Sequence, residues 1–153
     1  MDYNLIKTLH ILSATILFGT GLGSAYFMWS AQRTRDAQVI AAVAQHVVRA
    51  DWLFTTPTVI FQPLSGAWLV HAAGYTWSGW IGISLGLYAL AGLCWLPVVW
   101  LQIRMRNTAQ TAALQNQSLP QIYWRDAKLW FWLGVPAFIS IVAVFFLMVF
   151  KHL

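Results

Sequence analysis

Four long runs of apolar residues divide the chain, and each is close to the length that crosses a lipid bilayer. They cover residues 5–29, 53–73, 80–102 and 129–150. About 20 apolar residues suffice for one span, because an α-helix rises about 1.5 Å per residue. Backbone groups in lipid must satisfy their own hydrogen bonds, so each run is expected to be helical. The pattern predicts an all-α membrane protein, a four-transmembrane-helix bundle that forms a single domain over residues 1–153.

The connection between the first two runs, residues 31–51, also carries a helical period. Val39, Val43 and Val47 recur at helical spacing, and His46 lies beside them. An apolar stripe on an otherwise polar segment is typical of a helix lying at the membrane surface. We therefore expect a short amphipathic cytoplasmic helix between the first and second spans.

Polar and small residues recur at helical spacing inside three of the four runs. Such residues need partners in lipid, so each stripe is expected to face the interior of the bundle. The stripes are Ser13, Ala14, Gly21 and Ser24 in the first run, Thr55, Thr58, Gln62 and Ser65 in the second, and Ser84, Tyr88, Ala91 and Trp95 in the third, with Gln102 at the end of that run.

The composition supports the membrane assignment and excludes several other classes. Hydrophobic residues make up 59% of the chain and charged residues only 8%, whereas soluble domains carry about 25% charged residues. The formal net charge of +5 comes from residues at the ends of the runs, and no basic stretch with interleaved aromatics indicates nucleic-acid binding. The lipid bilayer is the expected partner, together with a second copy of the chain or a membrane redox partner.

The distribution of Arg and Lys predicts the orientation. Cytoplasmic connections are enriched in these residues, so connections 31–51 and 103–128 are expected in the cytoplasm of a bacterial inner membrane. Both termini would then be periplasmic. One side carries Arg33, Arg35, Arg49, Arg104, Arg106, Arg125 and Lys128, and the other only Lys7 and Lys151. Asp51 is expected to pair with Arg49 or a neighbouring arginine.

His10 is the leading candidate for chemistry, because it lies within the first apolar run. An ionisable side chain inside a span is a functional hypothesis by default, and neutral imidazole is a common ligand of haem iron and copper. The alternative is a histidine that only bonds a hydroxyl or carbonyl of a neighbouring helix.

His71 and Lys7 are the secondary candidates. His71 is expected on the same side of the membrane as His10, which permits a shared haem or metal. It lies nine residues beyond Gln62, however, which at about 100° per residue directs it away from the polar stripe. Lys7 lies one turn before His10, where it could pair with a haem propionate or extend to the membrane interface.

The motifs of soluble enzymes are missing from the sequence, so catalytic residues stay unassigned. It contains no phosphate-binding glycine loop, no G-x-S-x-G, no Cys-x-x-Cys and no His-Glu-x-x-His. The spans hold no carboxylate pair, which argues against a proton-coupled pump of the usual kind.

Short strings along the chain resemble a known family. They are LIKTLHI at 5–11, Thr56-Pro57 followed by SGAWL at 65–69, Gly79-Trp80, and YWR at 123–125. Together they resemble a DUF2269-like family of predicted bacterial integral membrane proteins of unknown function, which is distantly similar to HemJ-type protoporphyrinogen oxidases and to CopD-like copper-resistance proteins.

The resemblance implies a haem protein. His10 matches the first-span histidine that is linked to haem b in HemJ-type proteins. The lysine that follows the Gly-Trp pair in the HemJ-type pattern is absent, since residues 81–84 read IGIS. The resulting prediction is an integral membrane haem b-binding protein with a redox role. His10, His71 and Lys7 would hold the haem. The alternatives are an accessory or structural subunit without a cofactor, and a copper-handling protein with His10 and His71 as metal ligands.

Overall fold

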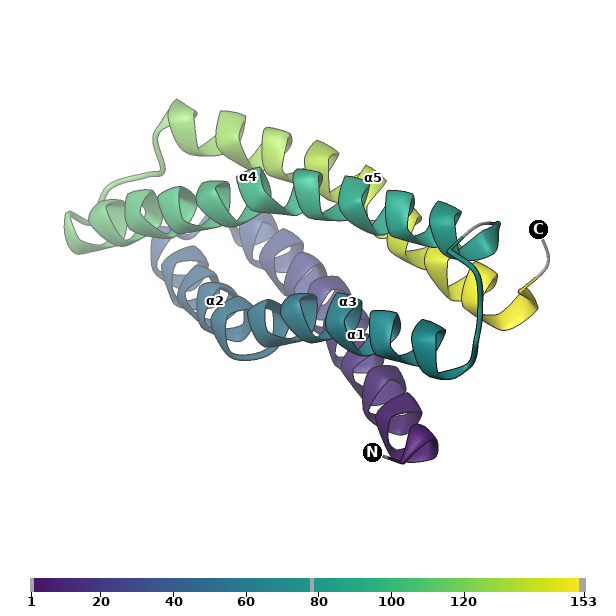
Figure 1. Ribbon diagram of the computed structural model, residues 1–153. Helices are drawn as coiled ribbons and strands as arrows, with labels where there is room; N and C mark the ends of the chain where they lie inside the picture. The colour runs from purple at the N-terminus through teal and green to yellow at the C-terminus, as the bar shows by residue number, and fades with distance from the viewer. Residues whose placement is uncertain (1, 78, 152–153) are drawn as a thin grey trace.

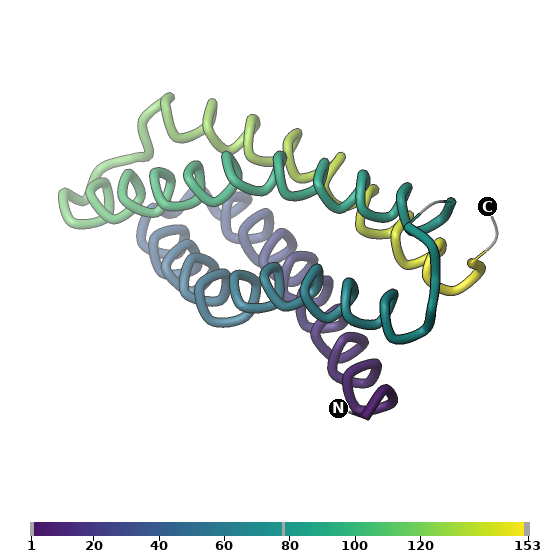
Figure 2. The backbone as a smooth tube through the Cα atoms, in the orientation of Figure 1, coloured from purple at the N-terminus to yellow at the C-terminus, as the bar shows by residue number. Residues whose placement is uncertain are grey.

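The computed structural model describes residues 2–77 and 79–151, and this part of the chain is helical without strands. Figure 1 shows the helices as two layers of long rods, and Figure 2 traces the same path through the backbone. The elements are α1 (Tyr3–Thr34), α2 (Ala37–Ala50), the π-helix η1 (Asp51–Thr55), α3 (Thr56–Ala72), α4 (Trp80–Leu114) and α5 (Gln121–Phe150).

The helices associate as two pairs that α2 joins at one end. α1 packs against α3, α4 packs against α5, and α2 contacts both α1 and α4. Both ends of the chain and the α3–α4 connection lie toward the right of Figure 1, while the α1–α2 and α4–α5 connections lie toward the left. The left end carries most of the arginines and is called the arginine-rich end below; the right end is called the His10 end.

Within residues 2–77 and 79–151, three helices, not four, are long and apolar enough to cross a membrane. They are α1, α4 and α5, so the prediction of four spans is wrong in number, although the all-helical architecture is confirmed. The span expected over 53–73 is shorter because residues Asp51–Thr55 wind as a π-helix and leave 17 residues to α3. Pro57 lies in the first turn of α3, directly after η1.

The connection expected over 103–128 is mostly helical. α4 continues to Leu114 and α5 begins at Gln121, so only residues 115–120 form the turn. α1 likewise continues to Thr34 and is closed by Arg35 in the left-handed conformation (φ 57°). Hydropathy predicted where the chain becomes polar, whereas the helices continue beyond that point.

The amphipathic helix expected over 31–51 is present as α2. Its predicted stripe is confirmed at Val47, which is buried, and at Val43, which packs against the core, but not at Val39. Ile40, Ala44 and Val47 are buried, whereas Val39 is 40% exposed. Asp36 begins the helix by accepting hydrogen bonds from the N–H groups of Gln38 and Val39, as N-cap carboxylates do. The apolar face of α2 packs on α1 and α4 inside the molecule.

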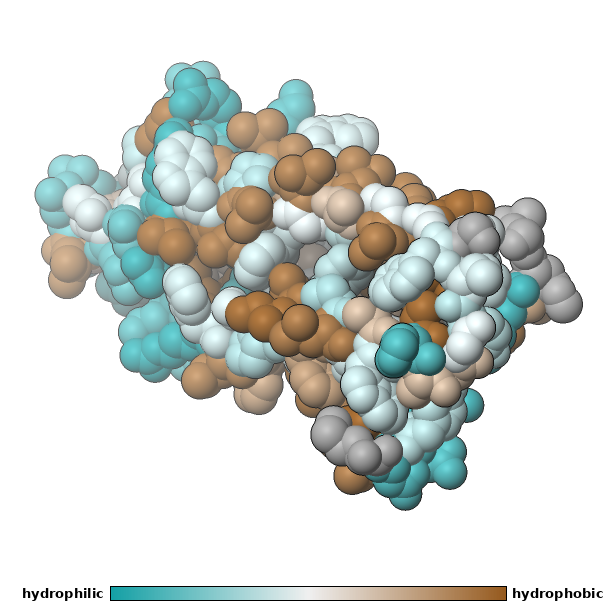
Figure 3. Space-filling view, in the orientation of Figure 1, coloured by the Kyte–Doolittle hydropathy of each residue, from teal (hydrophilic) through white to brown (hydrophobic). Residues whose placement is uncertain are grey.

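The buried apolar core lies at the arginine-rich end. Met28, Met105 and Tyr123 have no exposed surface, and they belong to one cluster with Ile40 of α2. Elsewhere the long helices present their apolar residues outward. In the most apolar 18-residue stretch of α5, only 6% of the residues are buried. Figure 3 shows apolar residues along the sides of the helices and hydrophilic ones gathered at the left end. This inside-out distribution is expected for helices that contact lipid.

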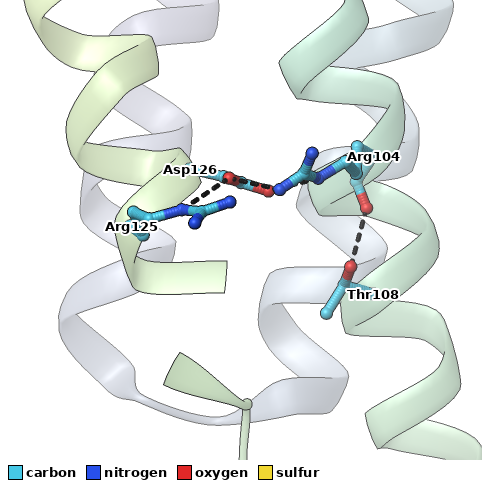
Figure 4. Close-up of polar contacts among 4 residues, drawn as sticks. All are labelled: Arg104, Thr108, Arg125 and Asp126. Atoms are coloured by element: carbon cyan, nitrogen blue, oxygen red, sulfur yellow. Dashed lines mark hydrogen bonds and ion pairs between the residues drawn. The ribbon is translucent and has the colours of Figure 1, made fainter. Parts of the chain in front are cut away.

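An ion pair joins α4 to α5 beside this core (Figure 4). Arg104 Nε lies 2.6 Å from Asp126 Oδ2, and Arg104 Nη2 donates to Asp126 Oδ1 at 2.7 Å. Thr108 donates its hydroxyl proton to the Arg104 carbonyl, and Arg125 approaches the same carboxylate at 3.8 Å. Asp126 is buried, and two donors from one guanidinium form the strong, geometrically specific type of pair.

Candidate functional site: an intramembrane cavity with a polar end

A cavity of about 360 Å³ lies between α1 and the α4–α5 pair, and η1 and α3 contribute to its wall. Along α4 its lining extends from Tyr88 to Gln102, which is about 21 Å at the rise of an α-helix. The cavity is therefore an elongated slot along α4, and the exposed residues Leu22, Phe131 and Ile139 in its lining leave it partly open to the outside.

Most of the cavity wall is apolar and aromatic. Phe18 from α1, Trp95 from α4 and Phe138 from α5 all line it. Phe18 and Phe138 stack with their ring centroids 5.3 Å apart, which links α1 to α5 across the slot. Gly92 and Gly134 also line the wall, and a Cβ atom added at either glycine would meet nothing within 4 Å. The slot therefore has room next to both glycines.

One end of the cavity is polar and belongs to the arginine-rich half of the bundle. Asp51 and Thr55 from η1, Gln102 from α4 and Trp130 from α5 line it, and all four are buried. Thr55 donates its hydroxyl proton to Asp51 Oδ1 at 2.8 Å. The other carboxylate oxygen, Asp51 Oδ2, has no hydrogen-bond partner, and neither has Gln102 Oε1 or Trp130 Nε1.

Asp51 is in an unusual electrostatic position. Burial raises the pKa of its carboxyl group, and hydrogen bonds from Thr55 and Gln102 partly oppose that rise. The ion pair expected between Asp51 and Arg49 is not formed in the described part of the chain, where the carboxylate with arginine partners is Asp126. Asp51 instead lines the cavity, four residues before Thr55, where the polar face of α3 continues back into η1.

The polar stripes expected in the second and third runs are confirmed as interior faces, whereas in the first run Ser13 and Ser24 are buried but Gly21 is exposed. Thr55, Thr58, Gln62 and Ser65 are all buried. Tyr88, from the stripe of the third run, donates its hydroxyl proton to the Val59 carbonyl at 2.7 Å and so connects α4 to α3.

His10 lies at the other end of the α1–α3 contact and does not line the cavity. Its Nδ1 is 2.7 Å from Ser65 Oγ, and Gln62 Nε2 donates to the His10 carbonyl at 2.9 Å. Ser65 directs its own proton to the Phe61 carbonyl, so its oxygen accepts from His10 Nδ1–H. This pattern favours the tautomer in which His10 Nε2 carries the lone pair.

The other two predicted ligands lie on the surface, in contrast to the half-buried His10. His71 and Lys7 are both exposed. His71 is five residues beyond Gly66, the α3 residue on which the His10 ring rests, and so occupies a different face of that helix. No group of three or more His, Cys, Asp or Glu side chains within residues 2–77 and 79–151 could hold a metal ion.

Sequence reasoning missed the polar end of the cavity. Asp51 was assigned to an ion pair with an arginine, yet it is buried at one site with Gln102 and Trp130. The available signal was spacing: Asp51 precedes Thr55 by four residues and so extends the polar stripe by one turn. The contribution of α5 is a tertiary contact that no local pattern reveals.

The fold and the outward-facing apolar helices define a multi-pass integral membrane protein. The family described as "Predicted integral membrane protein (DUF2269)" matches residues 4–152, and the chain belongs to this family. No curated protein and no solved structure matches the chain, so nothing supports the resemblance to HemJ-type or CopD-like proteins.

Proposed function

We propose that this protein is a membrane-embedded binding protein for a lipophilic small molecule, which occupies the cavity between α1 and the α4–α5 pair. The observation that carries the proposal is an apolar slot of about 360 Å³ that ends in buried polar atoms without partners. Ligand pockets are commonly about 300–1,000 Å³, mostly apolar, with a few polar groups that fix orientation.

The free-energy cost of the unpartnered polar atoms supports the presence of a ligand in this slot. A buried polar atom without a partner costs about 1–3 kcal/mol, and three of them lie around one space. Native proteins retain such groups where a ligand, an ion or ordered water satisfies them. A ligand that enters from the lipid would satisfy them without an aqueous path.

Filling the cavity tests the proposal. The protein is reconstituted in phosphatidylcholine nanodiscs with a photoreactive alkyl diazirine of twelve carbons, and labelled peptides are identified by mass spectrometry. We expect saturable labelling of the α4 and α5 lining. Gly92→Leu and Gly134→Leu place side chains in the slot and should abolish that labelling.

Gly19→Leu is the matched control. A Cβ at Gly19 also meets nothing within 4 Å, but this glycine is exposed and does not line the cavity. Labelling that does not saturate, or that survives both cavity-filling substitutions, would show contact with bulk lipid alone and would contradict the proposal.

Haem b at His10, with a redox role, is a second candidate, and the tautomer of His10 favours it. Ligating histidines generally donate their other ring N–H to a fixed acceptor, which Ser65 provides here. The haem would not occupy the cavity, because no His, Cys, Met or Lys lines it. His10 Nε2 would hold the iron, which supplies the redox chemistry, and Ser65 would fix the ring orientation.

Visible spectroscopy tests the haem candidate. Protein expressed with a haem precursor should show a Soret band that shifts on dithionite reduction and disappears in His10→Ala. Loss in His71→Ala or Lys7→Ala would assign the second ligand or the propionate partner. A colourless wild-type preparation removes haem and leaves an interhelical role for His10.

We further propose that the arginine-rich end faces the cytoplasm of a bacterial inner membrane, as the positive-inside rule indicates. Ser118→Cys, in the α4–α5 turn, should react with a membrane-impermeant maleimide only in inverted vesicles, and Tyr75→Cys, in the α3–α4 connection, only in intact spheroplasts. The opposite pattern would reverse the orientation.

A further inference from the structure

The three unpartnered atoms at the polar end of the cavity differ in chemistry, and together they specify what a ligand must offer. They come from separate elements, η1, α4 and α5, and each parent residue exposes less than a tenth of its surface. Trp130 Nε1 can only donate a hydrogen bond, and Gln102 Oε1 can only accept one. Asp51 Oδ2 accepts whenever the carboxyl group is ionised.

This set selects against most lipid head groups. An ammonium group donates but cannot accept, so it would leave Trp130 unsatisfied. An ether, an ester or a carbonyl group accepts but cannot donate, so it would leave Gln102 unsatisfied. A carboxylate fails in the same way and also meets the charge of ionised Asp51. A hydroxyl group accepts from Trp130 and donates its single proton to Gln102 or to ionised Asp51; when Asp51 is protonated, it accepts from that carboxyl group as well. It carries no charge into an otherwise apolar slot.

We propose that the cavity ligand is a neutral single-chain lipophile with a hydroxyl head group, held by Trp130, Gln102 and Asp51, whose chain runs along α4 toward Tyr88. This inference rests on the proposed lipophile-binding function. The elongated slot accommodates a chain, and the polar end fixes which way the molecule points. An aliphatic alcohol and an alkyl phenol share this chemistry, and aromatic side chains such as Trp95 and Phe131 favour the phenol.

A matched pair of probes tests the head group. 4-Dodecylphenol and its methyl ether share a chain and an oxygen acceptor, but only the phenol donates. Each competes with the photoreactive alkyl diazirine for the wild-type protein in phosphatidylcholine nanodiscs. We expect the phenol to compete at about tenfold lower concentration, the effect of one additional buried hydrogen bond. 1-Dodecanol in a third arm distinguishes the aliphatic from the phenolic source.

Substitutions at the polar end assign each contact. Trp130→Phe removes the donor that both oxygens use, so it should weaken both probes alike and preserve the preference for the phenol. Gln102→Met removes an acceptor that only the phenol uses, so it should reduce the preference. Trp132→Phe is the matched control, because Trp132 is on the same helix but 61% exposed, and it should change neither probe.

The outcomes separate this inference from the function on which it rests. If wild type binds the phenol and the ether equally, water satisfies the three atoms and the hydroxyl inference is overturned while lipophile binding stands. If Trp130→Phe leaves both probes unchanged, the assigned orientation is wrong. If neither probe displaces the diazirine and the diazirine does not saturate, the proposed function itself fails.

Discussion

The two ends of the molecule are stabilised by different physics. At the arginine-rich end, α2 lies against α1 and α4 and closes an apolar core that contains Met28, Ile40 and Met105. At the His10 end, α1 carries exposed Leu5 and Leu12. There α1 and α3 are joined by the hydrogen bonds of His10 with Ser65 and Gln62. A ring contact between Tyr3 and Trp68, whose centroids lie 6.4 Å apart, also joins them.

This difference shows at which end of the molecule apolar residues stabilise the protein. Burial of apolar surface is favourable relative to water, but lipid is as apolar as leucine, so helices in the bilayer associate through close packing and hydrogen bonds. The core at the arginine-rich end therefore holds the bundle together, whereas the His10 end is held by a few polar and aromatic contacts. The cavity lies between the α1–α3 and α4–α5 pairs, where neither mechanism fills the space.

Truncating an apolar side chain should give the largest contrast between a residue of the buried core and a residue on the exposed surface of the same helix. Met105→Ala removes a side chain with no exposed surface and should destabilise the protein by about 3–4 kcal/mol through lost burial and a residual cavity. Leu93→Ala truncates a side chain on the same helix that is 69% exposed and should cost less than about 1 kcal/mol. Unfolding in mild detergent followed by circular dichroism measures both. Equal costs would mean that the core adds nothing beyond lipid contact.

Breaking the Arg104–Asp126 pair should have the next largest effect. Arg104→Met leaves the buried Asp126 carboxylate with only the distant Arg125. Loss of one member of a buried pair costs about 3–5 kcal/mol, and the partial exposure of Arg104 reduces this to about 2–3 kcal/mol. Arg106→Met is the control, because Arg106 bonds only its neighbour Asn107 among the described contacts. Similar melting temperatures for the two variants would show that the ion pair is not needed.

The sequence predicted the parts of this fold that a periodic pattern reveals. The long helices, the interior faces of the second and third runs and the existence of α2 all follow from hydropathy and spacing. At the start of α2 the wrong residue was expected to be buried, because Val39 and Ile40 are equally apolar, and only the packing against α4 decides which is buried. The shortened α3 was missed because a π-helical turn has the same composition as an α-helical one.

The candidate site was predicted less well, and for a different reason. His10 was correctly identified as a polar residue with an interior partner, but its expected cofactor stays a prediction. The polar end of the cavity depends on Asp51, Gln102 and Trp130, which lie on three elements and meet only in the folded bundle. Composition places each at a membrane boundary, and from there an interfacial role is as reasonable as a buried one.

Titration of Asp51 should produce a smaller, pH-dependent effect on stability. Its folded pKa lies above the ordinary value of 3.8 for an aspartate, so the folded state binds more protons than the unfolded state between those two pKa values. Stability from this group is therefore fully present below pH 3.8 and decreases as pH rises through the folded pKa, by up to about 1.4 kcal/mol per pH unit. Melting temperatures of wild type and Asp51→Asn, measured from pH 3.5 to about 8, should converge at low pH, with the variant gaining relative stability as pH rises. A constant difference would contradict the raised pKa.

The smallest expected effect is at the His10 end. Ser65→Ala removes the hydroxyl that accepts from His10 Nδ1–H and should cost about 0.6 kcal/mol, the mean for an interhelical hydrogen bond in a bilayer. Thr15→Ala is the control, because the Thr15 hydroxyl bonds only the Ile11 carbonyl of its own helix. If Ser65→Ala also removes a Soret band that Thr15→Ala retains, the hydrogen bond orients a ligating imidazole. A loss of several kcal/mol in a colourless protein would instead mean that this single contact holds α1 to α3, and the contrast between the two ends would be wrong.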